Sequence, residues 1–330
     1  MGRYSSDMNK VLGIQESGTY GSAMTGSSFW IGQVQSNSID DKENKIETRY
    51  MGTSTRSVDT FDEGVRDVTG TVTYRAQDFR LPFWSIGSIY SVSGTNSVHT
   101  ATEIGTDQAQ SLFVSGALNP PISFTLEDSK QSPGTGRNFI RKINGCVLDR
   151  VSITATPSDV ITVEADYIGQ TLTYSSGTTT AVTEVTTNPY TFGNASLTLA
   201  GSSITAKEVT LEINQNVEAP HYLNGSRDIA TPYFKNRDYM LSVTMDLDST
   251  TAAMLYNQYY KSTSSFNGVF DLNGDSTTGS RHAIFTMSGC YITSMDNPSE
   301  IEGVTESTVE IRPKKISAQE FNRVAKYTPY

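Results

Sequence analysis

The sequence is poor in the side chains on which most catalytic and metal sites depend. Its 330 residues include only two cysteines and three histidines, which are His99, His221 and His282. Two distant cysteines cannot form a zinc site unaided and are most often small buried apolar groups. None of the histidines lies near a Gly-x-Ser-x-Gly nucleophile motif. We therefore expect no enzymatic activity, no cofactor and no metal site.

Positive charge and long apolar runs are also scarce. The chain has 25 Lys and Arg against 35 Asp and Glu, which gives a formal charge of −10. Tight binding to nucleic acid is not expected, because it needs basic side chains that displace counterions. No apolar run approaches the ~20 residues of a membrane helix, and the first residues lack the apolar segment of a secretory signal. We expect a soluble protein made in the cytoplasm, without a membrane partner.

What the sequence does contain is typical of a folded β protein. It has 17 Tyr and 26 Gly against 11 Pro, and Thr and Ser are abundant. In residues 206–214 and 239–248, polar and apolar side chains alternate with the period of two expected for a half-buried strand. The acidic residues on the polar faces of these two predicted strands are Glu208, Glu212, Asp246 and Asp248.

Three motifs recur in the same order along the chain, and this repetition predicts the domain organisation. RDVTGTVT (66–73) matches RDYMLSVT (237–244), RNFIRKINGC (137–146) matches RHAIFTMSGC (281–290), and TVE (162–164) matches TVE (308–310). Strand-like words recur often, but rarely in the same order at nearly equal spacing. We predict two homologous β-sandwich or barrel domains in tandem, residues 1–188 and 189–330, joined by the Ser- and Thr-rich segment near residues 175–190.

One short helix is expected on the flank of each domain, directly after its first repeated motif. The clearer one covers residues 249–261, where Ser249 or Thr250 can cap the first turn. Its counterpart covers residues 77–86 and is interrupted by Pro82.

Two charged connections are candidates for contacts between subunits. A long hairpin in the first domain and the loop 216–235 in the second occupy corresponding places. Most such residues simply form a solvated surface. Alternatively, hairpins of this length extend beyond their own domain and contact a neighbouring subunit. The candidate residues are Asp40, Asp41, Asp59, Asp62, Glu63, His221 and Tyr222.

Three ordered stretches carry a resemblance to a known family. They are LGIQESGTYG (12–21), NGCVLDRVSI (144–153), and VTLEINQNVE (209–218) continued through the Gly225 loop to Arg237-Asp238. The ordered set resembles the tail tube proteins of long-tailed viruses, in the form in which one chain carries two tube domains. The chain departs from the family pattern in its tyrosine-rich second helix and in residues 316–330.

This resemblance implies a structural virion protein that polymerises into stacked rings around a channel for viral DNA. Each domain is then expected to lend about four strands to the sheet that lines the channel. The implied partners are other copies of the chain, the tail terminator, tape measure and baseplate proteins, and DNA that passes without sequence-specific binding. The implied location is the virion tail, assembled in the host cytoplasm.

Strand spacing then selects the number of subunits. At about 4.8 Å per strand, twenty-four strands give a diameter near 37 Å, or about 45 Å once they tilt, and a duplex about 20 Å across passes. Twelve strands would give about 18 Å and forty-eight about 73 Å before tilt, which are too narrow and too wide. Six domains fit, so three chains are expected in a pseudo-hexameric ring. We expect Glu208, Glu212, Asp246 and Asp248 to face the DNA, because carboxylates repel phosphates.

An enzyme built on a double β domain stays an alternative, and hydrolytic activity of the purified monomer would reveal it. Two further alternatives are not enzymes. One is another virion β protein, such as a capsid or baseplate component. The other is a surface β-sandwich that binds carbohydrate, which should carry a signal peptide and an exposed aromatic platform. Trp30 and Trp84 are too few and too far apart in the sequence to predict such a platform.

Overall fold

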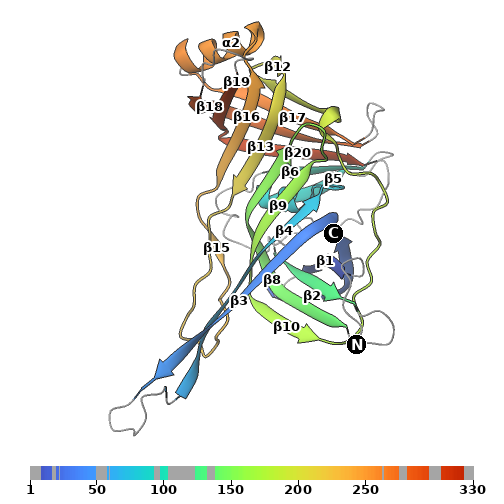
Figure 1. Cartoon of the computed structure of the whole chain (residues 1–330), viewed down its shortest axis with the longest axis vertical. Coiled ribbons are helices and arrows are strands. Elements are labelled where there is room, and N and C mark those ends of the chain that lie inside the picture. Colours follow the sequence, from blue (N-terminus) through green and yellow to red (C-terminus); the bar gives the residue numbers. More distant parts are fainter. Residues whose placement is uncertain are drawn as a thin grey trace.

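The computed structural model describes residues 9–16, 20–21, 23–49, 58, 60–92, 97–102, 123–131, 138–261, 264–274, 281–296 and 306–322. Within these ranges the chain is dominated by antiparallel strands, accompanied by two short α-helices (Figure 1). The prediction of a mainly β fold is confirmed. We refer to the described residues up to 188 as the first half and to those from 189 as the second half.

Eight strands form one continuous antiparallel sheet, which we call the long sheet. In spatial order they are β3 (Gln33–Thr48), β4 (Thr60–Arg75), β9 (Thr162–Gly169), the end of β8 (Phe139–Ala155), β13 (Ala206–Asn214), β16 (Asp238–Asp246), β19 (Glu306–Arg312) and the end of β18 (Arg281–Asp296). Because β8 pairs with β13, the long sheet runs without interruption from the first half into the second.

Two further sheets, which we call the side sheets, face the long sheet. The first contains β2 (Ala23–Trp30), β1 (Asn9–Glu16), β7 (Ser123–Lys130), the start of β8 and β10 (Thr171–Ser175). The second contains β12 (Ser202–Ile204), β11 (Ala195–Leu199), β17 (Phe266–Asn273), the start of β18, β20 (Lys315–Asn322), β6 (Ser97–Thr102) and β5 (Ser88–Val92). Strands β5 and β6 come from the first half, so they extend the side sheet of the second.

The repeated Gly-Cys motif marks the point where a long strand passes from a side sheet into the long sheet. Gly145 in β8 has φ 66° and Gly289 in β18 has φ 64°. This left-handed conformation suits glycine and bends the strand at a bulge. The following residues, Cys146 and Cys290, are fully buried. The sequence pattern therefore reflects a strand that must bend and then bury a small side chain.

The same register shifts occur in both halves. Around the two Gly-Cys motifs, β7 shifts against β8 between Phe124 and Leu126, and β17 shifts against β18 between Phe266 and Gly268. The other matching pairs of shifts are Leu148/Arg150 with Ile292/Ser294, and Val34/Ser36 with Ala206/Glu208. The first two sequence motifs align in this register. The third motif does not align. Val243 and Val72 are equivalent positions, and Val309 of the motif lies opposite Val243. The residue opposite Val72 is Ala165, which lies two residues beyond Val163 of the motif.

Both predicted helices are present, with different starting points. α1 (Arg80–Ile86) begins at Arg80, later than the predicted start at Gln77. Pro82 lies in its first turn, where the backbone N–H has no helical hydrogen-bond partner. α2 (Ser249–Leu255) continues as the π-helical segment η3 (Tyr256–Lys261). Its cap is Asp248, whose carboxylate accepts hydrogen bonds from the backbone N–H groups of Thr250 (2.8 Å) and Thr251 (2.7 Å). The predicted caps, Ser249 and Thr250, instead lie inside the helix.

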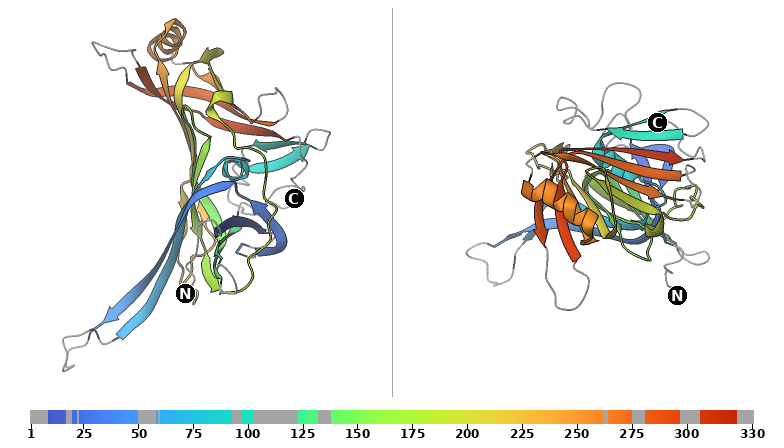
Figure 2. Two further views of the ribbon diagram at one scale, coloured as in Figure 1. Left: turned by 45° about the vertical axis from the view of Figure 1, so that its right-hand side comes forward. Right: turned by 90° about the horizontal axis from the view of Figure 1, so that it is seen from above.

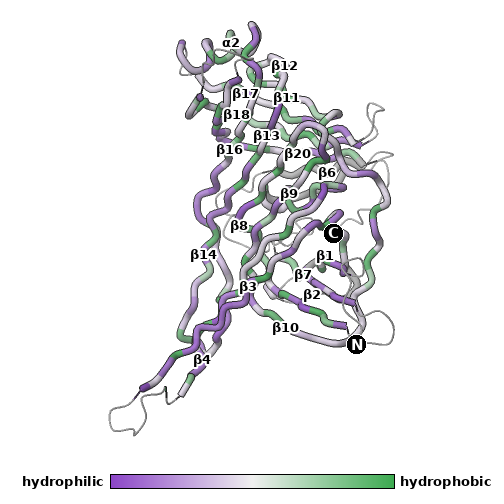
Figure 3. The backbone as a smooth tube through the Cα atoms, in the orientation of Figure 1, coloured by the Kyte–Doolittle hydropathy of each residue, from purple (hydrophilic) through white to green (hydrophobic). Residues whose placement is uncertain are grey.

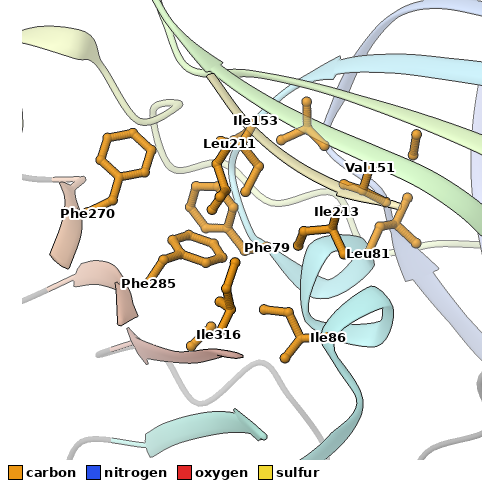
Figure 4. Close-up of a cluster of buried hydrophobic side chains, with 14 of the residues drawn as sticks. Phe79, Leu81, Ile86, Val151, Ile153, Leu211, Ile213, Phe270, Phe285 and Ile316 are labelled. Carbon is orange, nitrogen blue, oxygen red and sulfur yellow. The ribbon is translucent and has the colours of Figure 1, made fainter. Parts of the chain in front are cut away.

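The hydrophobic core is continuous between the two halves. Figure 4 shows Phe79, Leu81 and Ile86, from α1 and the turn before it, between long-sheet residues such as Leu211 and side-sheet residues such as Phe285. The rings of Phe79 and Phe285 meet edge to face, with centroids 5.6 Å apart. Each fully buried aromatic side chain of this kind stabilises the fold by roughly 2–3 kcal/mol. The halves are therefore packed together as one body.

One hairpin leaves this body. Strands β3 and β4 continue well beyond the long sheet and project away from the rest of the chain (Figure 2). The projecting part is mostly hydrophilic (Figure 3), with a few exposed apolar side chains such as Ile46 and Phe61. Beside its base runs the connection between β13 and β16, which includes the two-stranded pair β14 (Val217–Glu218) and β15 (Tyr233–Phe234).

Candidate functional site: a polar sheet face with open edges

The face of the long sheet that points away from the core is polar along its whole length. In β13, Val209, Leu211 and Ile213 are buried, while the alternate residues Glu208 and Glu212 are not. Strand pairing continues this face across the sheet, since Thr210 lies opposite Thr154 on one side and Ser242 on the other. Other members are Ser38, Thr71, Asp166, Ser152, Thr244, Glu310 and Asp296. We call it the polar face.

Acidic groups outnumber basic groups on the polar face, and two of its basic groups are each shared among several carboxylates. The guanidinium of Arg150 lies 2.8 Å from Asp166, 3.7 Å from Glu212, and also pairs with Glu164. Hydrogen bonding to Asp166, followed by the charges of all three carboxylates, raises the pKa of Arg150. Such partly exposed pairs contribute little to stability, about 0–1 kcal/mol each. They do compensate repulsion among the acids.

A second shared base lies at the other end of β13. The Nζ atom of Lys207 lies 2.8 Å from Asp246 and also contacts Glu306. Hydrogen bonds to these two carboxylates raise the pKa of Lys207. Neither Arg150 nor Lys207 was singled out from the sequence. Their carboxylate partners come from other strands, so only strand pairing brings the groups together.

The structure places three of the four predicted channel residues on the polar face. Glu208, Glu212 and Asp246 lie on the exposed side of β13 and β16. The predicted strand position of Asp248 is wrong, because β16 ends at Asp246 and Asp248 caps α2. The backbone and side chain of Thr251 donate hydrogen bonds that lower the pKa of Asp248. That the other three residues face DNA stays a prediction.

Both ends of the long sheet are open within the described part of the chain. β3 pairs only with β4, and the end of β18, residues 291–296, pairs only with β19. Each open edge presents a row of backbone N–H and C=O groups without a strand partner. Such edges pair readily with another chain.

The candidate residues of the hairpin divide into two groups. Asp41 forms a bidentate ion pair with Arg66, with a closest N–O distance of 2.7 Å, and this hydrogen bonding lowers the pKa of Asp41. Asp40 and Asp62 are exposed on the open hairpin, and Glu63 pairs with Arg227 at 2.6 Å. Asp59 lies outside the described residues. Contacts of these residues with another subunit stay a prediction.

The loop 216–235 is partly engaged within its own chain. It carries His221, which lies 2.9 Å from Asp67, and Arg227, which donates to the carbonyl of Gly64 at 2.8 Å. The loop therefore rests on β4 of the first half. Tyr222 remains 60% exposed at its tip.

One buried acid, Glu16 in β1, was quoted in the sequence only as part of a longer stretch. Its carboxylate is fully buried and accepts hydrogen bonds from the backbone N–H groups of Gly21 and Gly145 and from the hydroxyls of Ser123 and Thr125. Four donors compensate for the loss of water around the charge. Glu16 therefore holds β1 and β7 against the Gly145 bulge. The signal available in the sequence was an acid that continues the alternation of Leu12 and Ile14, and so lies on the same face of the strand.

Within the described residues no three His, Cys, Asp or Glu side chains are grouped so as to hold a metal ion. Burial raises the pKa of both thiols, of Cys146 well above its ordinary value and of Cys290 to about 11. Trp84 is buried and the indole of Trp30 donates to Gln77 at 2.8 Å, so the tryptophans form no shared exposed platform. Among the described helices, none is both long and apolar enough to cross a membrane.

A large antiparallel sheet with one polar face and open edges is suited to assembly by strand pairing. A model of the phage tail tube protein family matches residues 90–312, which is more than half of the chain. The chain therefore belongs to the phage tail tube protein family. It is a structural, non-enzymatic protein of the virion tail that assembles into a tube with other tail proteins. A search of curated proteins finds no match.

Proposed function

We propose that three copies of the chain close into a ring, and that stacked rings form a hollow tail tube through which viral DNA leaves. One observation carries this proposal: the long sheet has eight strands, and both of its edges remain open within the described residues. Rotation about a central axis brings the β18 edge of one subunit against the β3 edge of the next. Head-to-tail contacts of this kind close into rings.

The strand count supports three subunits. Three long sheets contribute twenty-four strands, and at about 4.8 Å per strand with barrel tilt they enclose a channel about 37–45 Å wide between backbones. Side chains narrow this passage and still leave room for a duplex. Two subunits would give a passage close to the duplex width, and four would leave the DNA loosely held.

The internal symmetry of the chain supports a pseudo-hexameric ring. Matching register shifts and matching Gly-Cys bulges occur in the two halves, and each half supplies four strands to the long sheet. We interpret residues 1–188 and 189–330 as two copies of one tube domain. A trimer of such chains presents six similar units around the axis.

The polar face suits a channel wall that DNA must pass without binding. Its excess of carboxylates repels phosphates, and two of its bases, Arg150 and Lys207, are held by carboxylates. The opposite face of the same strands is occupied by the core, so only the polar face is available to line the channel. Glu208, Glu212 and Asp246 then face the DNA.

Electron microscopy of the purified protein tests this proposal. We expect hollow, regularly banded tubes, and averaged end views of single rings with threefold symmetry and six similar lobes. The physical reason is that the unpaired backbone N–H and C=O groups of the two open edges all find hydrogen-bond partners only when the ring closes. Compact single particles at high protein concentration, or rings with another symmetry, would contradict the proposal.

A further inference from the structure

The contact between the two halves has two parts, of which the first is a strand pairing. β8 of the first half pairs with β13 of the second in a register that places Ser152 opposite Glu212 and Arg150 opposite Asn214. This pairing is the only place where the long sheet passes from one half to the other within the described residues. It therefore shows the register in which the edge of the long sheet formed by β8 pairs with the edge formed by β13.

The second part is a helix that crosses the junction. α1 belongs to the first half and packs against β13 and β20 of the second, with residues 81–86 buried. At its C-terminal end, Arg237 donates to the carbonyl of Ile86 and Gln215 donates to the carbonyl of Ser85. The second half thus satisfies two carbonyl groups that the end of a helix leaves open.

The repeated register shifts define which residues of the two halves are equivalent. Around the Gly-Cys bulges, residues of β18 lie 144 positions after those of β8, and the shifts on both sides keep this spacing. β13 lies 172 positions after β3, as the matching shifts at Ser36 and Glu208 indicate. In the same register Arg237 and Gln215 correspond to Arg66 and Glu43, which lie opposite each other in β3 and β4.

We propose that the contact between neighbouring subunits repeats the contact between the halves of one chain, with equivalent strands paired in the same register. This inference rests on the proposed ring and specifies its interface. The end of β18 takes the place of the end of β8, and β3 of the next subunit takes the place of β13. The transferred register puts Ser294 opposite Lys42 and Asp296 opposite Asp40. Lys42, whose Nζ lies 2.8 Å from Asp40, offsets the repulsion between the two carboxylates.

The exposed side chains around α2 fit this interface. α1 is covered by the second half, whereas α2 and η3 leave Tyr256, Tyr259 and Tyr260 exposed by 59, 40 and 66%. In the repeated contact these tyrosines pack on the next subunit, next to β3 and β10. Exposed tyrosines are typical of protein interfaces because they bury large area at low entropic cost. Arg66 takes the place of Arg237 near the end of the helical segment.

The projecting hairpin also finds its place. The loop 216–235 of the second half rests on the adjacent first half, with the backbone N–H of Arg66 donating to the carbonyl of Arg227 at 2.9 Å. The hairpin β3–β4 is the equivalent connection of the first half. Its neighbour on that side is the second half of another subunit. Contact with that subunit explains why the hairpin projects from this chain and why Ile46 and Phe61 are 57 and 61% exposed.

Disulfide formation between singly substituted chains tests the register. Chains carrying Asp40→Cys are mixed with chains carrying Asp296→Cys, and Lys42→Cys with Ser294→Cys, before assembly and mild oxidation. The off-register controls mix Asp40→Cys with Ser294→Cys and Lys42→Cys with Asp296→Cys. Because each chain carries only one introduced cysteine, any disulfide between introduced cysteines links two different subunits. Cys146 and Cys290 do not compete, because both are buried and have raised thiol pKa values.

We expect the in-register mixtures to give at least tenfold more cross-linked dimer on non-reducing gels than the off-register mixtures. Directly opposite side chains lie about 5 Å apart at Cβ, whereas diagonal ones lie about 7 Å apart, which is too far for a disulfide. Microscopy of the same samples separates the two proposals. If tubes form but cross-linking favours the off-register mixtures, or shows no preference, the inferred register is overturned and the proposed tube still stands. Unsubstituted chains that form no tubes overturn the proposed function itself.

Discussion

At the residue scale, Glu320 shows how a single buried group joins the two halves. It lies on β20 in the second half, fully buried, and its carboxyl group contacts the hydroxyl of Tyr190 and the backbone N–H of Phe79. Burial, and next the negative charge of Asp78, raise the pKa of Glu320 to about 8 from an ordinary value of 4.5. Arg281 acts in the opposite direction, but its guanidinium is also engaged by the Tyr190 ring and the Asn188 carbonyl. Burial and the charge of Asp78 both favour the protonated, neutral form of Glu320.

A pH dependence of stability follows from this raised pKa. A group protonated in the folded state and ionised in the unfolded state contributes full stability below pH 4.5, and loses it as the pH rises through about 8. We expect Glu320→Gln to remove this loss, because Gln stays neutral and keeps its acceptor for Phe79. At pH 8.5 the variant should exceed the unsubstituted chain in free energy of unfolding by an amount on the order of a few kcal/mol.

Urea unfolding of dilute protein between pH 5 and 8.5 measures this effect. Glu310→Gln, at an exposed position in β19, serves as the matched control and should follow the unsubstituted chain. Equal pH profiles for Glu320→Gln and the unsubstituted chain would show that Glu320 is ionised in the folded protein.

At the element scale, β8 and β18 have the same bend but different surroundings. A Cβ atom added to Gly145 would lie 2.8 Å from Cβ of Gln170 and 2.9 Å from the Tyr20 ring. A Cβ atom added to Gly289 would lie 3.0 Å from the flexible side chain of Lys314. Both glycines have positive φ, so both substitutions strain the backbone, but only the first also meets atoms that cannot easily move.

We therefore expect Gly145→Ala to destabilise the chain more than Gly289→Ala. The backbone strain costs roughly 1–2 kcal/mol at either site, and the clash at Gly145 adds about 1–3 kcal/mol. Urea unfolding curves of the two variants measure the difference. Gly177→Ala, where an added Cβ atom has no neighbour within 4 Å, is the control for loss of glycine. Equal costs at the two bulges would contradict this account of their packing.

At the scale of the whole molecule, the polar face connects the charge of the chain to its proposed role. Replacing Glu208 and Glu212 together by Lys reverses charge on β13 and leaves both open edges unchanged. We expect tubes of normal appearance and DNA release from virions slowed severalfold, because lysines facing the channel attract phosphates. Measuring release after triggering, with dye entry into the DNA as the signal, tests this.

A variant with the same change of charge elsewhere provides the control. Asp159 and Glu184 are exposed and lie outside the strands that carry the polar face, so Asp159→Lys combined with Glu184→Lys should leave release kinetics unchanged. Equal slowing by both double variants would attribute the effect to net charge. Unchanged release in the Glu208 and Glu212 variant would argue against a channel lined by this face.

The sequence by itself determined those features that depend on neighbours along the chain. Alternation in residues 206–214 predicted a strand with Glu208 and Glu212 on one face, and the repeated Gly-Cys motif marked equivalent points of two long strands. Both follow from local geometry, since successive side chains of a strand point to opposite faces and left-handed backbone suits glycine. The start of the second helix was not determined in this way, because the consecutive residues Asp248, Ser249 and Thr250 can each cap a helix, and the predicted caps were Ser249 or Thr250.

Only the tertiary structure decided which strands share a sheet and which edges stay open. β8 is longer than its motif suggested and serves two sheets, while β5 and β6 of the first half complete the sheet of the second. The partners of Arg150, Lys207 and Glu320 likewise come from distant strands. Strand pairing between distant segments depends on register and core packing, and these are properties of the folded chain that no local sequence pattern encodes.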